Sequence, residues 1–174
     1  MLILLAYLPV VAFGYWLKYL NLSHLKIHGH EVPPEFEGTV DPVVLGKISD
    51  YTVENSRFGF LESIFDNVVL VIFLFGGVLV VYDQWVASLT DSFLWGGVLF
   101  ALLLTYIQTV IGIPFSLYRN FRIENKYGFN TMTLKIWFSD LVKGLAIGTV
   151  LGTVTVLAAL WIISVSPAFW WFWG

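Results

Sequence analysis

The sequence predicts an all-α polytopic membrane protein in which four helices cross the bilayer and two long loops face the cytoplasm. Hydrophobic residues make up 58% of the 174-residue chain and charged residues 12%, whereas soluble domains carry about 25% charged residues. The mean hydropathy is +0.81. Four apolar stretches are each long enough to cross a hydrocarbon core about 30 Å thick, which takes roughly 20 helical residues. We therefore predict a single membrane domain over residues 1–174.

The predicted spans cover residues 2–20, 64–86, 93–117 and 141–165. The first resembles a signal peptide in its apolar length, but it has neither a basic amino-terminal region nor an A-x-A-like cleavage site. Its apolar run ends in the aromatic residues Tyr15, Trp16 and Tyr19. A retained anchor is therefore the preferred interpretation, and a cleaved leader is the alternative.

Positive charge sets the predicted orientation. All nine Lys and Arg residues lie in or beside the loops 21–63 and 118–140. The short connection 82–92 has two charged residues, Asp83 and Asp91, and both are acidic. The positive-inside rule then places both long loops in the cytoplasm and both termini outside it. The aromatic tail 169–173 is typical of a belt at the outer interface.

Polar residues on the third span form one helical stripe. Thr105, Gln108, Thr109 and Gly112 recur at i, i+3, i+4 and i+7. A Gln amide near the middle of the bilayer costs free energy unless it finds a partner. We therefore expect this stripe to face other helices or a water-filled space, with simple helix packing as the alternative.

The fourth span carries Gly144, Gly148 and Gly152, a doubled G-x-x-x-G pattern that lets a second backbone approach closely. These glycines are predicted to serve helix packing.

The stretch HGHEVPP (28–34) resembles the start of a zinc-protease H-E-x-x-H helix, but Val32, Pro33 and Pro34 stand where that helix would continue. Two consecutive prolines prevent the turn that would align a second His. His24 and His28 are four residues apart, with His30 nearby, and a solvated loop is the preferred interpretation. The chain has no cysteine, so no thiolate metal site or disulfide is available, and we predict no metal site in it.

Charged residues between the third and fourth spans predict an elbow at the membrane surface. Gly128 permits a sharp turn there, and Asn130 or Thr131 can cap the next helix. A helix running unbroken from there to Val165 is about 50 Å long and must project from the membrane or bend. In the first loop, the stretch DYTVENSRFGFLES (50–63) is predicted to begin a helix that continues into the second span.

The run FRIENKYGFNTMTLKIWFSDLVKG (121–144) resembles a signature, F-x-I-E-x-x-x-G-F-N-x-x-T…D-x-x-K-G, of the CAAX prenyl protease 1 family of integral-membrane zinc metalloproteases. The stretch YTVENSRF (51–58) resembles the family's segment before its second span, and the terminal PAFWWFWG resembles the sequence ahead of its fifth. The resemblance covers nearly the whole chain. The matching positions of the elbow and the following helix are Phe121, Ile123, Glu124, Gly128, Phe129, Asn130, Thr133, Asp140, Lys143 and Gly144.

The resemblance implies a seven-span helical barrel enclosing an intramembrane chamber, with zinc held by an H-E-x-x-H helix and a later Glu. Family members cut peptide bonds, in eukaryotes near the carboxyl terminus of prenylated CAAX proteins. No H-E-x-x-H occurs in the 174 residues, so no catalytic residue is assigned and zinc is expected only in a catalytic part outside this chain. Thr105, Gln108 and Thr109 then become candidate chamber lining.

The preferred interpretation is therefore the amino-terminal membrane domain of such a protease, inactive by itself. Its partners would be membrane lipid, a peptide substrate and a catalytic carboxyl-terminal half in the same or a separate chain, and no nucleic acid. The alternative is a stand-alone, non-catalytic membrane scaffold that associates through its glycine face. A metal-binding or transport role for His24, His28 and His30 is a third, weaker hypothesis.

Overall fold

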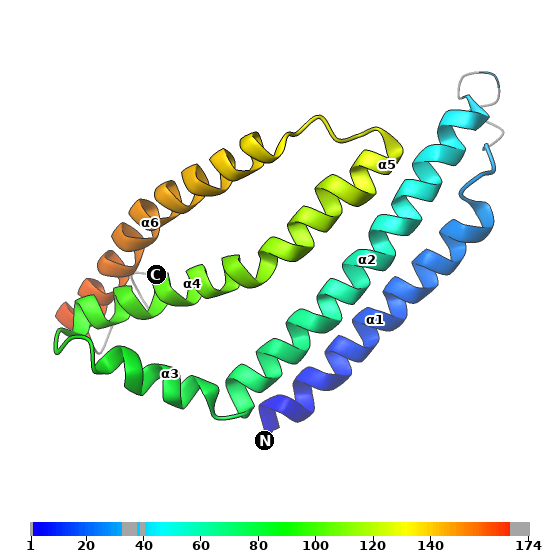
Figure 1. The fold of residues 1–174 in the computed structure, drawn as a ribbon. Coiled ribbons are helices and arrows are strands. Elements are labelled where there is room, and N and C mark those ends of the chain that lie inside the picture. The colour runs from blue at the N-terminus through cyan, green and yellow to red at the C-terminus, as the bar shows by residue number, and fades with distance from the viewer. Residues whose placement is uncertain (1, 33–37, 39–40, 168–174) are drawn as a thin grey trace. The chain divides into compact units, whose positions relative to one another are not determined.

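The computed structural model describes residues 2–32, 38 and 41–167, and within them the secondary structure is entirely helical (Figure 1). The helices are, in chain order, α1 (Leu2–His28), α2 (Pro42–Phe75), α3 (Val78–Ala87), α4 (Phe93–Tyr118), the π-helical turn η2 (Arg119–Glu124), α5 (Asn125–Tyr127) and α6 (Leu134–Val165). Four helical segments are long and apolar enough to cross a membrane, namely α1, α2, the run Phe93–Tyr127 and α6. The predicted all-α, four-span class is confirmed. The aromatic tail 169–173 lies outside the described residues.

The helices extend well into the segments predicted as loops. In the first loop, α1 continues to His28. Helix α2 runs through 50–63 toward the second span as predicted, but it begins earlier than predicted, at Pro42. In the second loop, η2 and α5 continue directly from α4, and α6 begins at Leu134. The bounds differ from the prediction because hydropathy marks only the apolar part of a helix, whereas the polar parts here are held by contacts with other helices.

The predicted second span, 64–86, is not one helix. Helix α2 ends at Phe75 and α3 begins at Val78, with Gly76 and Gly77 between them. Gly77 has a φ of 83°, in the left-handed region that costs residues with a side chain free energy. The glycine pair therefore ends α2, and α3, with 10 residues, is too short to cross the bilayer by itself.

The helices pack into two compact units. Unit 1 comprises residues 1–68 and 117–131, and unit 2 comprises residues 69–116 and 132–174. In unit 1, α1 lies beside the first part of α2 (Figure 1). The Tyr15 hydroxyl donates to the Ser63 carbonyl (2.9 Å) and accepts from the Asn67 amide (2.8 Å), and its ring meets Phe60 edge-on with centroids 5.0 Å apart. The Asn67 amide oxygen also accepts a hydrogen bond from the Tyr7 hydroxyl. Both ends of the Asn67 amide therefore have hydrogen-bond partners between the apolar helices α1 and α2.

In unit 2, α3 packs on α4 and α4 packs on α6. The Tyr82 hydroxyl of α3 donates to the Phe100 carbonyl of α4 (2.6 Å). The Trp137 indole of α6 donates to the Ser116 hydroxyl of α4 (3.0 Å). At the start of α6, Thr133 caps the helix by accepting a bond from the Ile136 amide. These contacts fix the α4 and α6 hairpin that carries the candidate site.

Candidate functional site

A groove of about 450 Å³ lies between α4 and α6 in unit 2. We call it the α4–α6 groove. Its walls include Thr105, Tyr106 and Thr109 from α4, and Asp140, Gly144 and Gly148 from α6. The groove therefore joins two features that the sequence placed on separate helices, the polar stripe of the third span and the glycine stripe of the fourth.

The threonines of the groove satisfy their hydroxyls within their own helix. Thr105 donates to the Ala101 carbonyl (2.8 Å) and Thr109 donates to the Thr105 carbonyl (2.8 Å). Such bonds let a hydroxyl enter an apolar span at low cost. The hydroxyls of these threonines need no hydrogen-bond partner from another helix. They therefore do not draw a side chain of α6 into the groove.

The glycines do not bring the two backbones together at the first two positions. A Cβ added at Gly144 or Gly148 would meet nothing within 4 Å in the described chain, and one at Gly152 would meet Leu102 Cδ2 at an ordinary 3.5 Å. Among the described residues, close packing through the doubled G-x-x-x-G is thus not made at Gly144 and Gly148. The physical reason is the bulk of Tyr106, which stands between the helices and bonds Thr149 on α6 (2.6 Å).

Gln108 lies on α4 but not in the groove wall. Its side chain is exposed, and its amide makes no hydrogen bond with the described residues. Gly112, the last member of the predicted stripe, likewise faces open space. The stripe is therefore divided, with the two threonines in the groove and the other two residues on an uncovered side of α4.

Asp140 and Lys143 lie one turn apart on α6, with the Lys143 Nζ 3.7 Å from the Asp140 carboxylate. Both side chains are more than half exposed, so the pair contributes little to stability. Asp140 is the charged residue of the groove wall, which gives the groove one polar end.

The signature residues of the elbow close a tight turn in unit 1. Gly128 has a φ of 73°, the Glu124 carbonyl accepts from the Phe129 amide (2.9 Å), and the Asn125 carbonyl accepts from the Gly128 amide (3.1 Å). This is the pattern that ends a helix on a left-handed glycine. Ile123, in the preceding π-helical turn with Phe121, is 1% exposed. The signature thus specifies the geometry of the elbow, and the sharp turn predicted at Gly128 is confirmed.

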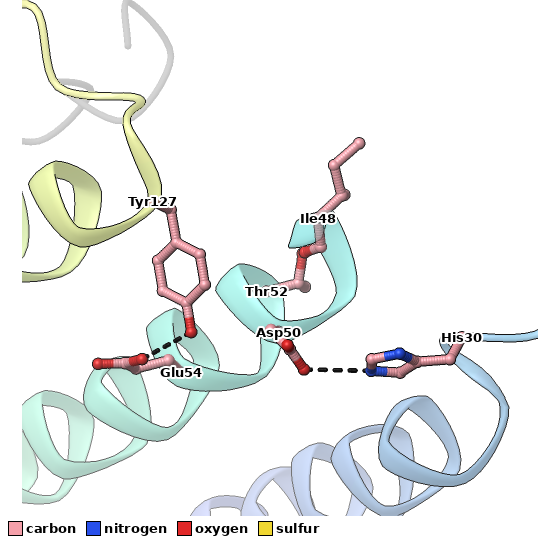
Figure 2. Close-up of polar contacts among 6 residues, drawn as sticks. All are labelled: His30, Ile48, Asp50, Thr52, Glu54 and Tyr127. Carbon is pink, nitrogen blue, oxygen red and sulfur yellow. Dashed lines mark hydrogen bonds and ion pairs between the residues drawn. The ribbon is translucent and has the colours of Figure 1, made fainter. Parts of the chain in front are cut away.

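Two acidic residues of α2 that sequence reasoning did not select anchor this elbow. Glu54 accepts from the Tyr127 hydroxyl (2.7 Å) and from the Lys126 ammonium (2.5 Å), as Figure 2 shows for Tyr127. Glu62 pairs with Arg119 at the start of the elbow.

Aromatic contacts extend the same face of α2. Tyr51 meets Phe129 edge-on with ring centroids 4.8 Å apart, and Phe58 stacks on Tyr118 at the same separation. The residues of α2 that contact the elbow are Lys47, Tyr51, Glu54, Phe58 and Glu62. Successive members of this set are four, three, four and four residues apart, so they lie on one face of α2. This helical spacing of polar and aromatic residues is the sequence signal that could have identified the face.

The three histidines lie on the last turns of α1 and just after it. The His28 Nδ1 lies 2.9 Å from Glu31, and the His30 Nε2 lies 3.1 Å from Asp50 on α2 (Figure 2). Within the described residues no group of three His, Asp or Glu side chains is arranged to hold a metal ion. The part of the chain that the structure describes therefore does not fit the zinc site that the family resemblance implies, and Pro33 and Pro34 of HGHEVPP lie outside it.

Comparison with known proteins agrees with the elbow signature. Residues 21–174 match a family described as CAAX prenyl protease N-terminal, five membrane helices. The chain is 31% identical over 150 residues to CAAX prenyl protease 1 homolog of Caenorhabditis elegans, covering 85% of this chain and 33% of that protein. It is 32% identical over 155 residues to probable CAAX prenyl protease 1 of Schizosaccharomyces pombe, covering 81% of this chain and 33% of that protein.

The fold is also similar to the crystal structure of S. mikatae Ste24p, with a TM-score of 0.84 and 23% identity. That match covers 95% of this chain and 40% of the other. The chain therefore spans about a third of the curated relatives that it matches. The family description counts five membrane helices, whereas the described residues hold four of spanning length and the shorter apolar α3.

Proposed function

Because the chain belongs to the CAAX prenyl protease N-terminal family, we propose that it works as the amino-terminal membrane domain of a zinc metalloendopeptidase, and that the α4–α6 groove is part of the chamber wall that receives the peptide substrate. The groove is the observation that carries the proposal. It lies between apolar helices, its wall includes three glycines of α6, and the hydroxyls of Thr105 and Thr109 are already bonded within α4.

A wall of this kind suits a peptide chain. Gly144 and Gly148 carry no side chain, so an extended substrate can approach the α6 backbone closely. The groove volume of about 450 Å³ is enough for a few side chains. The polar end at Asp140 gives the substrate a preferred direction along the groove.

The zinc ligands and the general base are proposed to come from a catalytic carboxyl-terminal half, in the same or a separate chain. The 174 residues contain no H-E-x-x-H, and among the described residues no three His, Asp or Glu side chains are grouped so as to hold a metal ion. The contribution of this chain is to enclose and orient a peptide near that centre, so the chain alone should not hydrolyse peptides.

The experiment fills the groove without disturbing the packing around it. Gly148→Leu adds a side chain where a Cβ meets nothing within 4 Å, and Gly14→Leu makes the same change on α1, outside the groove wall. Each variant is reconstituted in proteoliposomes with the catalytic half, and peptide cleavage is measured. A steric cost of about 1–3 kcal/mol predicts a loss in kcat/KM of about fivefold to about 150-fold for Gly148→Leu alone.

Equal activity of the two variants would refute the role of the groove. Gln108→Leu tests the third residue that the sequence predicted as chamber lining. Gln108 lies outside the groove wall, and its exposed amide is available to a substrate or to another helix of the barrel. The proposal expects Gln108→Leu to lower folding or activity of the reconstituted protease. Normal folding together with normal cleavage would remove Gln108 from the chamber wall.

A non-catalytic scaffold is the second candidate, and the open faces of Gly144 and Gly148 favour it. A second copy could place its own helix there, as small-xxx-small interfaces do. Single-molecule photobleaching of the labelled protein in bilayers separates the two functions. Gly148→Leu should abolish a dimer if the scaffold role is correct, and should lower peptide cleavage without changing oligomeric state if the chamber role is correct.

The sidedness of the membrane domain is also part of the proposal, with the 21–63 and 118–140 segments in the cytoplasm and both termini outside it. Since the chain has no cysteine, single cysteines can be introduced without a background. Lys47→Cys should react with an impermeant maleimide only after the membrane is opened, and Ser92→Cys should react in intact cells. The reverse pattern would invert the topology.

A further inference from the structure

A second groove, unrelated to the α4–α6 groove, lies between α1 and α2 in unit 1. We call it the α1–α2 groove, and its volume is about 500 Å³. Its walls include Lys18, Asn21 and Leu22 from α1, and Thr52, Ser56 and Phe60 from α2. The groove therefore combines one cation and several neutral polar groups with apolar walls.

The polar groups of this groove are largely unengaged. The Lys18 Nζ reaches only the Ser63 hydroxyl at a long 3.4 Å and the Tyr15 ring at 6.0 Å, and it pairs with no carboxylate among the described residues. In the same described part of the chain, the Asn21 amide and the Ser56 hydroxyl make no hydrogen bond. An ammonium on an apolar helix without a counter-charge is unfavourable unless an anion or water reaches it.

Aromatic residues on α1 place Lys18 at the depth of the lipid headgroups. Trp16 and Tyr19 flank Lys18 and are 54% and 64% exposed. Such amphipathic rings concentrate at the boundary between hydrocarbon and headgroups. The cation and the free hydroxyl and amide of the groove therefore lie where phospholipid phosphates lie.

We propose that the α1–α2 groove binds the headgroup of an anionic phospholipid. The Lys18 ammonium pairs with the phosphate, Asn21 and Ser56 hydrogen-bond the phosphate or the polar substituent beyond it, and Leu22 and Phe60 contact the glycerol and upper acyl region. Charge complementarity selects an anionic lipid over a zwitterionic one, because the described residues of the groove wall include a cation and no carboxylate. This proposal stands independently of the protease function.

The test is a lipid titration of the intact protein in detergent, followed by native mass spectrometry with phosphatidylglycerol and with phosphatidylcholine. One lysine near an anionic lipid contributes about a fivefold change in affinity. Lys18→Gln should therefore weaken phosphatidylglycerol binding about fivefold and leave phosphatidylcholine unchanged, and Lys18→Arg should keep the preference. Lys26→Gln is the matched control, because Lys26 is an exposed lysine of α1 outside the groove wall.

Ser56→Leu is the second variant and keeps the test valid if Lys18→Gln does not fold. It fills the groove and should reduce retention of phosphatidylglycerol while leaving Lys18 in place. Equal effects of Lys18→Gln and Lys26→Gln would overturn the proposal, since they would indicate surface charge alone. Displacement of phosphatidylglycerol by inorganic phosphate at the same affinity would also overturn it, because the site would then recognise a free anion.

Discussion

The hydrogen bond between Tyr106 and Thr149 ties α4 to α6 beside the α4–α6 groove, and its direction follows from the geometry. The Thr149 hydroxyl lies 2.6 Å from the Leu145 carbonyl, to which it donates its single proton. The Tyr106 hydroxyl, also 2.6 Å from Thr149 Oγ1, must therefore be the donor in the interhelical bond. Tyr106→Phe and Thr149→Val each remove this bond while nearly conserving shape.

The expected magnitude can be worked out for a membrane setting. Interhelical hydrogen bonds in membrane proteins contribute about 0.6 kcal/mol on average and about 1.7 kcal/mol at most. The bond between Tyr106 and Thr149 is short and partly buried, which places it in the upper half of that range. A double-mutant cycle of Tyr106→Phe and Thr149→Val should therefore give a coupling free energy of about 1 kcal/mol.

The assay is reversible unfolding in lipid micelles, with the free energy measured for the wild type, both single variants and the double variant. The control cycle combines Tyr106→Phe with Ser164→Ala, because the Ser164 hydroxyl bonds the Trp161 carbonyl of its own helix and lies several turns of α6 beyond Thr149. Its two effects should add within about 0.3–0.5 kcal/mol. If the cycle of Tyr106 with Thr149 is equally additive, the bond does not hold α4 to α6 and the account of the groove is refuted.

Three further changes test the turns and contacts that frame the units. Gly128→Ala should lower stability by about 1–2 kcal/mol because its φ is 73°, and an unchanged melting temperature would contradict that reading of the elbow. Tyr82→Phe should cost about 1 kcal/mol in the same micelle assay, since Tyr82 is 8% exposed and donates to the Phe100 carbonyl, and no loss would show that water replaces the bond. Gly29→Ala would place a Cβ 2.2 Å from the Ser49 hydroxyl, so overpacking of about 1–3 kcal/mol should appear as a lower melting temperature, which wild-type stability would exclude.

The four apolar segments were predictable because hydropathy depends on each segment alone. The full length of α2 was not fixed by the same argument, since its first half is polar and is held by residues far along the chain. Glu62 bonds Arg119, 57 positions away, and Glu54 bonds Tyr127, 73 positions away. The sequence shows that these residues recur along one face of α2, but only the fold shows that the face contacts the elbow.

The residue that caps α6 could not be identified from capping propensity alone. Asn130 and Thr131 were the expected caps, and Thr133 is the cap in the structure. The reason lies in the preceding turn, where the Asn130 amide bonds back to Glu124 and belongs to the end of the earlier helix. The new helix can begin only after the chain has left the turn at Gly128, and three good capping residues close together do not reveal that delay.

Polar residues in this membrane domain fall into two classes with different consequences. Thr105 and Thr109 bond carbonyls of their own helix, so they add small volume and little unsatisfied polarity to the α4–α6 groove. Gln108 keeps an unengaged amide on the exposed side of α4 within the described chain, so its cost must be met by a partner outside these residues. Side-chain volume should therefore determine what binds in the α4–α6 groove, and hydrogen bonding should determine what binds the face around Gln108. A volume change at Gly148 and a polarity change at Gln108 therefore probe separate surfaces. In the proposed function the surface at Gly148 faces the substrate, and the surface at Gln108 faces the helices that complete the wall.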